Sequence, residues 1–260
     1  MGYVTTEMPN NLFYKSTKIK FMKNSIIYNV TGRYALFTDP ISKLGGEKCS
    51  YHLPTYEALK GITKSIYWKP SIIWYIDKVR IMNRIRTESK NMKPLKFGGG
   101  NDLAIYTYLH DVEYQVQAHF EFNKHREDLK EDFNEGKHFS IAKRMLMKGG
   151  RRDVCLGSRE CQGYVEPCEF GEGESHYDND GELAYGLMFH GFDYPDEIGK
   201  EELWAKFWRP VMKDGIIEFP MPDDASLVRK FVKPMKAYPP QTQELKETAL
   251  MNELQEGGAL

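Results

Sequence analysis

Residues 103–122, LAIYTYLHDVEYQVQAHFEF, decide the fold. Over the second half of this stretch, apolar and polar side chains alternate, and one face would carry Val112, Tyr114, Val116, Ala118, Phe120 and Phe122. Side chains point alternately to the two faces of a β-strand, so strict alternation is the pattern of a strand with one buried face. The stretch therefore predicts a strand.

The segment before it, KVRIMNRIRTESK at residues 78–90, is basic. Read as a strand, it places Val79, Ile81 and Ile85 on one face, and on the other face a row of cations: Lys78, Arg80, Arg84, Arg86 and Lys90. The apolar face can pack on a core while the cationic face stays outside. A protein of formal net charge -1 has no bulk attraction for polyanions. The row thus indicates a local phosphate-binding surface, with nucleic acid as the leading partner.

The remaining predicted elements give the order of strands and helices along the chain. A strand is expected at 25–38, a helix capped by Thr55 and stopped by Pro70, a second helix capped by Ser140 and stopped at Gly149-Gly150, and an extended segment at 152–164. Strand, helix, strand, strand, helix, strand is the order of ferredoxin-like domains, to which RNA-recognition modules belong. The predicted fold class is α+β, with a ferredoxin-like amino-terminal domain and a smaller β-rich carboxy-terminal domain.

Composition shifts divide the chain further. Residues 1–22 are expected to form a poorly structured lead, 23–164 the ferredoxin-like domain, 165–235 the β-rich domain and 236–260 a tail. Turn signals such as DNDG at 178–181 and KDG at 213–215 separate short apolar segments in the third part, as in successive hairpins.

Charge is segregated along the chain. Residues 136–152 hold six Lys or Arg and no acid, whereas residues 166–202 hold twelve acids and Lys200 alone. A single run of this kind equally fits a solvated face, but two basic runs in one half favour that half as the binding half. The second run adds four candidate RNA-binding residues: Lys143, Arg144, Arg151 and Arg152.

Several classes of protein are disfavoured. The apolar runs are far shorter than a membrane span, and the default expectation is a cytoplasmic location. Cys49, Cys155, Cys161 and Cys168 lack metal-binding spacing and are too few for a disulfide scaffold. A P-loop requires Lys-Ser or Lys-Thr after its glycines, and neither follows the Gly98-Gly99-Gly100 run. Neither a metal nor a cofactor is expected.

The residues with the clearest chemistry are Tyr67, Lys137 and His138. Lys137 could neutralise a phosphorane and His138 could move a proton, although the same segment also fits an ordinary solvated loop, and Tyr67 fits a core position. A ribose 2′-hydroxyl that attacks its own phosphate needs no metal, because the nucleophile is already in the substrate. Histidine is the better base at neutral pH, while tyrosine could orient the hydroxyl or protonate the leaving oxygen.

Several long motifs resemble one known family. They are YALFTDPISKLGGEKCSYHLPTYEALKGITKSIYWKP, IRTES, FGGGN, AHFEFN, NEGKHFS and GGRRDVCLGSRECQGYVEPCEFG, and they occur in the order found in the type I-C (Dvulg) CRISPR-associated protein of the fifth Cas family. The resemblance runs from about residue 24 to about residue 234. Residues 1–21 fall outside it, and Met22 is a plausible natural start.

The resemblance carries functional implications. Such proteins are metal-independent endoribonucleases that cut the repeat hairpin of precursor CRISPR RNA and stay on the 5′ handle within the interference complex. For this chain the first hypothesis is a ribonuclease that leaves a 2′,3′-cyclic phosphate and a 5′-hydroxyl. Their catalytic tyrosine, lysine and histidine match Tyr67, Lys137 and His138. Two alternatives stay open: a non-catalytic RNA-binding assembly subunit that contacts backbone and large subunits, and binding of duplex DNA by the same basic surface, since phosphate contacts do not distinguish sequence.

Overall fold

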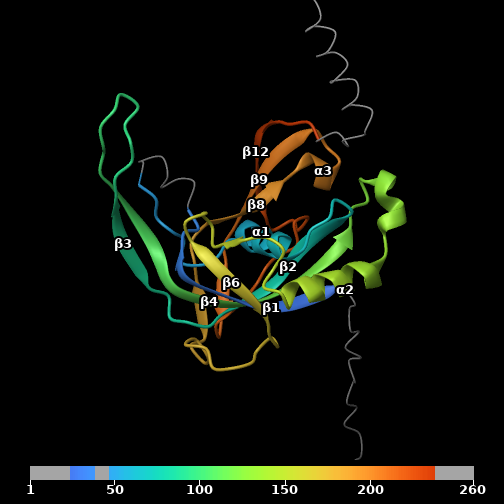
Figure 1. The fold of residues 1–260 in the computed structure, drawn as a ribbon, viewed down its shortest axis with the longest axis horizontal. Helices are drawn as coiled ribbons and strands as arrows, with labels where there is room; N and C mark the ends of the chain where they lie inside the picture. The colour runs from blue at the N-terminus through green and yellow to red at the C-terminus, as the bar shows by residue number, and fades with distance from the viewer. Residues whose placement is uncertain (1–23, 39–46, 238–260) are drawn as a thin grey trace, which may run out of the picture.

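The computed structural model describes residues 24–38 and 47–237, so the predicted lead at 1–22 and nearly all of the predicted tail at 236–260 lie outside the described residues. A nine-stranded sheet runs β5-β6-β1-β4-β2-β11-β10-β7, with β3 paired to part of β4, and a three-stranded sheet runs β12-β9-β8 (Figure 1). Every strand pair within these two sheets is antiparallel. The chain therefore has a mixed α/β fold built mostly on antiparallel sheets.

The predicted central strand is confirmed as β4, Ala104–Phe122. It pairs with β1 (Ser25–Ala35) on one side and with β2 (Ile72–Ile81) on the other, and its outer half pairs with β3 (Thr87–Met92). The apolar face from Val112 to Phe120 is buried, as the alternation predicts, while Phe122 is partly buried. The β3–β4 hairpin projects from the body at one side (Figure 1).

Two helices cover this apolar face. The first, α1 (Tyr56–Ile66), is capped by the Thr55 hydroxyl, which accepts from the Ala58 amide at 3.2 Å, and it buries Leu59, Ile62 and Ile66. The second, α2 (Glu135–Leu146), packs against β1 and β6 (Gln162–Pro167), which pairs with the short β5 (Val154–Cys155). The segment expected at 152–164 thus becomes these two strands.

The predicted start of the second helix is wrong. Asn134, not Ser140, is the N-cap, because its side-chain oxygen accepts from the Lys137 amide at 3.0 Å. Ser140 lies one and a half turns inside the helix. Lys137 and His138 therefore stand on a rigid helix and not in the loop before it.

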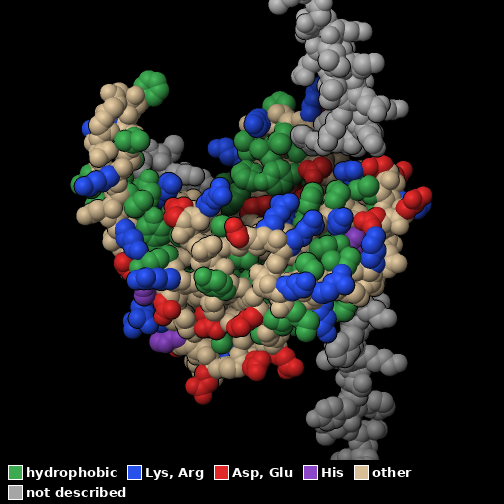
Figure 2. All heavy atoms as spheres, in the orientation of Figure 1, with side chains coloured by type: hydrophobic (Ala, Val, Ile, Leu, Met, Phe, Trp, Pro, Cys, Tyr) green, Lys and Arg blue, Asp and Glu red, His purple; other side chains and the backbone are tan. Residues whose placement is uncertain are grey.

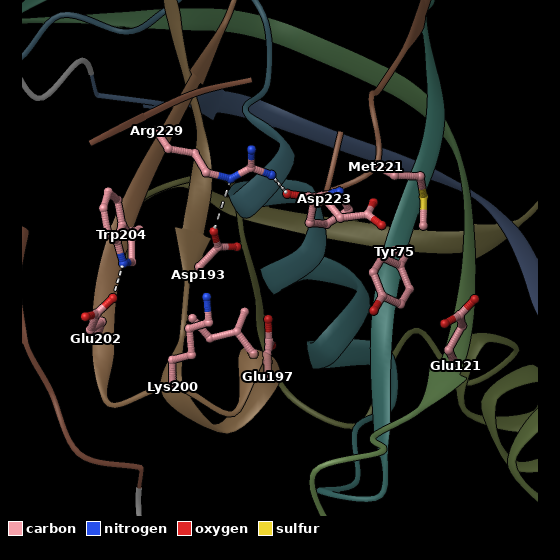
Figure 3. A pocket seen from close by; sticks show the side chains of 12 residues that line it. Tyr75, Glu121, Asp193, Glu197, Lys200, Glu202, Trp204, Met221, Asp223 and Arg229 are labelled. Atoms are coloured by element: carbon pink, nitrogen blue, oxygen red, sulfur yellow. Dashed lines mark hydrogen bonds and ion pairs between the residues drawn. The ribbon is translucent and has the colours of Figure 1, made fainter. Parts of the chain in front are cut away.

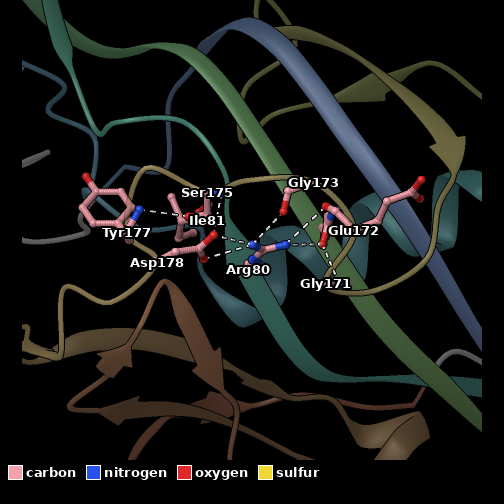
Figure 4. A network of polar contacts seen from close by, with 9 residues as sticks. Arg80, Ile81, Gly171, Glu172, Gly173, Ser175, Tyr177 and Asp178 are labelled. Carbon is pink, nitrogen blue, oxygen red and sulfur yellow. Dashed lines mark hydrogen bonds and ion pairs between the residues drawn. The ribbon is translucent and has the colours of Figure 1, made fainter.

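The basic segment at 78–90 is not one strand. β2 ends at Ile81 and β3 begins at Thr87, so Arg84 and Arg86 lie exposed in the connection between them. Arg80 is buried instead of sharing their exposed face. The Arg80 guanidinium donates to the Asp178 carboxylate at 2.9 Å and to the carbonyls of Glu172 and Gly173 at 3.2 and 3.0 Å (Figure 4).

The strands after residue 165 contribute to both sheets. β7 (Glu182–Ala184), β10 (Val211–Lys213) and β11 (Ile216–Glu218) extend the large sheet through a β11–β2 pairing. The small sheet, next to the short helix α3 (Pro195–Ile198), consists of β8 (Met188–Asp193), β9 (Glu202–Trp208) and β12 (Val228–Pro234). The domain boundary at 165 stays a prediction and does not coincide with a boundary between sheets. Within the described residues, no helix is long and apolar enough to cross a membrane.

Candidate functional site

Tyr67 ends helix α1 and points inward. Its backbone turns extended at this residue, and its N–H donates to the Thr63 carbonyl at 3.1 Å. The Trp74 indole donates to the Tyr67 carbonyl at 2.7 Å and fixes the turn against β2. The Tyr67 ring is buried, which places its hydroxyl inside the molecule, beneath helix α2.

His138 meets that hydroxyl. Its Nδ1 lies 2.8 Å from the Tyr67 Oη, and its Nε2 lies 2.8 Å from the backbone carbonyl of Asp132. A carbonyl can only accept, so Nε2 carries a proton and Nδ1 of the neutral imidazole accepts the Tyr67 O–H. The imidazole has no exposed surface, and the rings of Phe120 and Phe122 approach it edge to face. Sequence positions far apart are thus joined in one buried pair.

Asp132 connects Lys137 to this pair. It ends the short 3-10 helix η2 (Glu127–Asp132), and its carboxylate accepts from the Lys137 ammonium and, at 2.6 Å, from the Ser71 hydroxyl. The same carboxylate lies 3.5 Å from His138 Nε2. These hydrogen bonds, from Lys137 first and then from Ser71, hold the pKa of Asp132 below its usual value. The lysine, the histidine and the tyrosine therefore share one polar cluster.

The protonation of Tyr67 follows from its surroundings. Burial raises the pKa of Tyr67 and the negative charge of Asp132 raises it further, while the positive charge of Arg151 acts in the opposite direction. A phenol whose pKa lies above its ordinary value near ~10 stays protonated at neutral pH. Tyr67 is therefore suited to donate or relay a proton rather than to act as an ionised base.

Basic side chains of the second run flank the cluster. The N–H groups of Arg151 and Arg152 both donate to the Ser65 carbonyl, at 3.0 and 3.1 Å, so the loop after α2 is fastened to the end of α1. Lys143 and Arg144 are exposed in the last turns of α2. Figure 2 shows Lys and Arg side chains gathered around α2 on this side of the molecule. Of these four predicted residues, Arg151 acts electrostatically on Tyr67, while Lys143 and Arg144 lie on the same helix as His138, in its last turn.

The first basic run is placed differently. The Lys78 ammonium lies 4.3 Å from the centre of the Phe170 ring, and the Lys90 ammonium lies 3.3 Å from the centre of the Tyr34 ring. Arg80 is withdrawn into the network described above. The five cations of this run therefore do not form the single row that the sequence predicts.

Comparisons with known proteins identify the family of this chain. The family model for CRISPR-associated proteins of the Cas5d type matches residues 25–220. The chain belongs to the Cas5d family. The CRISPR pre-crRNA endoribonuclease Cas5d of Mannheimia succiniciproducens is 30% identical over 230 residues, covering 76% of this chain and 96% of that protein. The protein of the same name from Thermus thermophilus is 28% identical over 187 residues, covering 68% and 77%.

Solved structures agree with the family assignment. The crystal structure of a CRISPR-associated protein aligns at a TM-score of 0.66 and 34% identity, covering 78% of this chain and 96% of the other. The structure of a functionally uncharacterized protein from Streptococcus mutans aligns at a TM-score of 0.65 and 36% identity, with the same coverage. The fold is therefore that of this Cas family, and the resemblance seen in the sequence is confirmed.

Two members of the cluster in this Cas5d chain were missed by sequence reasoning. Asp132 and Ser71 have no motif of their own, and Ser71 lies 61 residues before Asp132. Their contact depends on how η2 folds back against the start of β2, which local patterns do not encode. No group of three His, Cys, Asp or Glu side chains within the described ranges is arranged to hold a metal ion.

A cavity of about 540 Å³ lies elsewhere in this Cas5d chain, beside α3 and β9 (Figure 3). Its wall includes Tyr75, Glu121, Asp223 and Trp204. The nearby carboxylates add to burial in raising the pKa of Tyr75 to about 12. The lining holds five carboxylates against two cations, Lys200 and Arg229, so its net negative charge makes this cavity a poor candidate for the RNA backbone.

Proposed function

We propose that this chain is a metal-independent endoribonuclease that cuts precursor CRISPR RNA at the repeat hairpin and stays on the 5′ handle as a cytoplasmic subunit of the type I-C interference complex. The observation that carries the proposal is the 2.8 Å contact between Tyr67 Oη and His138 Nδ1, with Lys137 held beside it through Asp132. The names of the two curated relatives, pre-crRNA endoribonucleases, support the same reaction.

The reaction follows from the hydrogen-bond direction in the cluster. The 2′-hydroxyl gives its proton to the Tyr67 oxygen as the Tyr67 proton passes to His138 Nδ1, so tyrosine relays the proton without ionising. The 2′-oxygen then bonds to phosphorus and the bond from phosphorus to the 5′-oxygen breaks. The leaving 5′-oxygen takes up a proton from water, and His138 returns its extra proton to water through Tyr67 once the products have left. The products are a 2′,3′-cyclic phosphate and a 5′-hydroxyl, and no metal takes part.

Lys137 supplies the positive charge. Its side chain is half exposed while it pairs with Asp132, so it can exchange that carboxylate for a phosphate without leaving helix α2. Lys137 and His138 both contact Asp132, and this shared partner keeps the cation near the base. Stabilisation of a developing phosphorane by such a cation commonly contributes as much as proton transfer does.

The fold supports an RNA-binding frame. In sheet order, the strands β6, β1, β4 and β2 stand side by side, and with α1 and α2 they follow the chain order of the split βαβ motif. We infer that this part is a ferredoxin-like domain whose helices, and not only its sheet, present the reactive groups. RNA and the other subunits of the complex are its proposed partners.

The experiment is cleavage of a repeat hairpin in the presence of EDTA. We expect one cut at an unchanged rate, with a 2′,3′-cyclic phosphate at the upstream end and a 5′-hydroxyl at the downstream end, because the nucleophile and all charges come from RNA and protein. Mapping the ends by phosphatase and kinase treatment checks the chemistry. Loss of cleavage on chelation, with recovery on adding magnesium, would contradict the proposal.

One observation favours a second function. The His138 side chain is fully buried, so no RNA group reaches it until the η2 segment or Tyr67 moves. If that movement does not occur, the chain is a non-catalytic subunit that grips the handle through its basic surface and also holds duplex DNA there. Tight binding of the hairpin with no product over hours is the result that would select this function.

The exposed arginines between β2 and β3 give a further prediction. Arg84→Glu and Arg86→Glu together should weaken hairpin binding and make its salt dependence shallower, by roughly 0.7 in slope for each phosphate that the protein no longer neutralises. Lys200→Glu together with Lys213→Glu, two exposed charge reversals outside the two basic runs, changes the net charge by the same amount and is the matched control. Filter binding across a salt series measures both. Equal slopes for the arginine variant and the control would remove these arginines from the interface.

A further inference from the structure

A groove lies on the outer face of α1, next to the cluster but separate from it. Gly61, Lys64 and Ser65 lie at helical spacing on α1, and together with Trp68, which follows the end of the helix, and Arg152 they line a cleft of about 340 Å³. Trp68 is 40% exposed, unlike its neighbour Tyr67, whose ring points to the interior. The groove therefore offers a partly exposed aromatic surface beside two cations, Lys64 and Arg152.

Nothing in the fold requires a glycine at position 61. It lies in the middle of α1, where glycine is less favourable than alanine, and a Cβ added there would meet nothing within 4 Å. Its backbone does not adopt the left-handed conformation that requires glycine. Because Gly61 has no side chain, the helix backbone is uncovered at this point of the groove, where glycine allows a close approach.

Hydrogen bonds connect the groove to the segment beside the reactive cluster. The Ser65 carbonyl on its wall accepts the N–H groups of both Arg151 and Arg152. Arg152 lines the groove, whereas the charge of Arg151 acts on the Tyr67 hydroxyl. A nucleotide in the groove and a phosphate at the cluster would thus lie on the two sides of one pair of arginines. Lys64, which also pairs with Glu197 at 3.3 Å, adds a second cation to the lining of the groove.

We propose that this groove is a nucleobase subsite: one unpaired base of the RNA next to the cut stacks on the Trp68 indole above Gly61, and its phosphate lies against Arg152 and Lys64. The proposal deepens the ribonuclease function and rests on it. A planar ring over a bare helix backbone, between an aromatic face and cations, is the arrangement that binds a base without reading its sequence. A partner protein's apolar side chain is the competing occupant.

The test combines protein variants with altered RNA. Trp68→Ala should weaken binding and slow cleavage of the repeat hairpin by roughly 10- to 100-fold, and Trp68→Phe should recover most of the loss, because phenylalanine still stacks. Replacing the unpaired nucleotides beside the cut by abasic residues, one at a time, should slow the unmodified protein equally at one position. At that position the same RNA should slow Trp68→Ala no further. Trp204→Ala, which removes an indole from the small sheet, is the matched control.

Gly61→Gln separates the subsite from a structural role. It fills the groove with a good helix former, so the melting temperature should rise by roughly 1 to 4 °C while hairpin binding falls about 10-fold. A substitution at a merely structural position is not expected to raise the melting temperature while it weakens hairpin binding. Unchanged binding in both Trp68→Ala and Gly61→Gln, or losses that simply add to those of the abasic RNA, would overturn the subsite. Failure of the unmodified protein to cleave at all would instead count against the ribonuclease function.

Discussion

His138→Gln is expected to lower the single-turnover rate of hairpin cleavage at least ~100-fold while hairpin affinity stays within about threefold of the unmodified protein. General acid or base catalysis commonly contributes ~100- to 10,000-fold, and glutamine cannot take up the proton that Tyr67 relays. The imidazole has no exposed surface, so its replacement removes no RNA contact made in this state. Rapid-quench cleavage and filter binding measure the two quantities separately.

Glutamine is preferred to alanine because His138 is packed between Phe120 and Phe122. A side-chain amide keeps a donor for the Asp132 carbonyl, whereas His138→Ala would leave a cavity and an unpaired carbonyl. Phe139→Leu, the next residue along α2 and partly buried, controls for packing changes in the helix. A His138→Gln variant that cleaves as fast as the unmodified protein would refute the assignment of the base.

Tyr67→Phe tests the relay within the same experiment. It removes only the hydroxyl that bonds to Nδ1, and the ring stays in the core. If tyrosine relays the proton, the rate should fall nearly as far as in His138→Gln, and the double variant should fall little further, because the two groups act on one proton. Independent, multiplying losses would mean that Tyr67 serves the leaving oxygen or the orientation of RNA.

The spacing of apolar residues and the helix caps predicted the individual strands and helices that such local signals specify. Period-two alternation identified β4, and Thr55 together with Leu59, Ile62 and Ile66 identified α1. The start of α2 was missed because Asn134 and Ser140 are both good caps, and no Glu or Gln three residues after Asn134 marks a capping box. Which of two competing caps wins depends on the packing of His138 and Ala142 against the sheet.

The site was predicted in part for a similar reason. Tyr67, Lys137 and His138 came from motifs shared with the family, and the structure brings them together. Asp132 and Ser71 came from no motif, since their pairing exists only once η2 has folded back on β2. Alternation also says which side chains share a face but not whether another segment covers that face, and this is why Arg80 was misplaced.

Arg80→Ala is expected to lower the free energy of unfolding by about 2–4 kcal/mol, the second large effect. The guanidinium is 5% exposed and donates to the Asp178 carboxylate and to the carbonyls of Glu172 and Gly173 (Figure 4). Alanine leaves a void beside the 170–178 loop and removes several of the hydrogen bonds that tie this loop to the sheet, while those made by Gln115 and Ser175 remain. Urea unfolding, read as a shift in midpoint at constant slope, measures the loss.

Two matched variants separate the loss of a positive charge from the loss of the buried hydrogen bonds. Arg84→Ala removes the same charge from an exposed position four residues away and should change stability by less than about 0.5 kcal/mol. Arg80→Lys should recover only part of the loss, because an ammonium cannot serve the carboxylate and both carbonyls in the planar geometry of guanidinium. If Arg80→Ala instead unfolds like the unmodified protein and binds RNA more weakly than Arg84→Ala does, then Arg80 is a phosphate contact after all, and the loop that covers it must open when RNA binds.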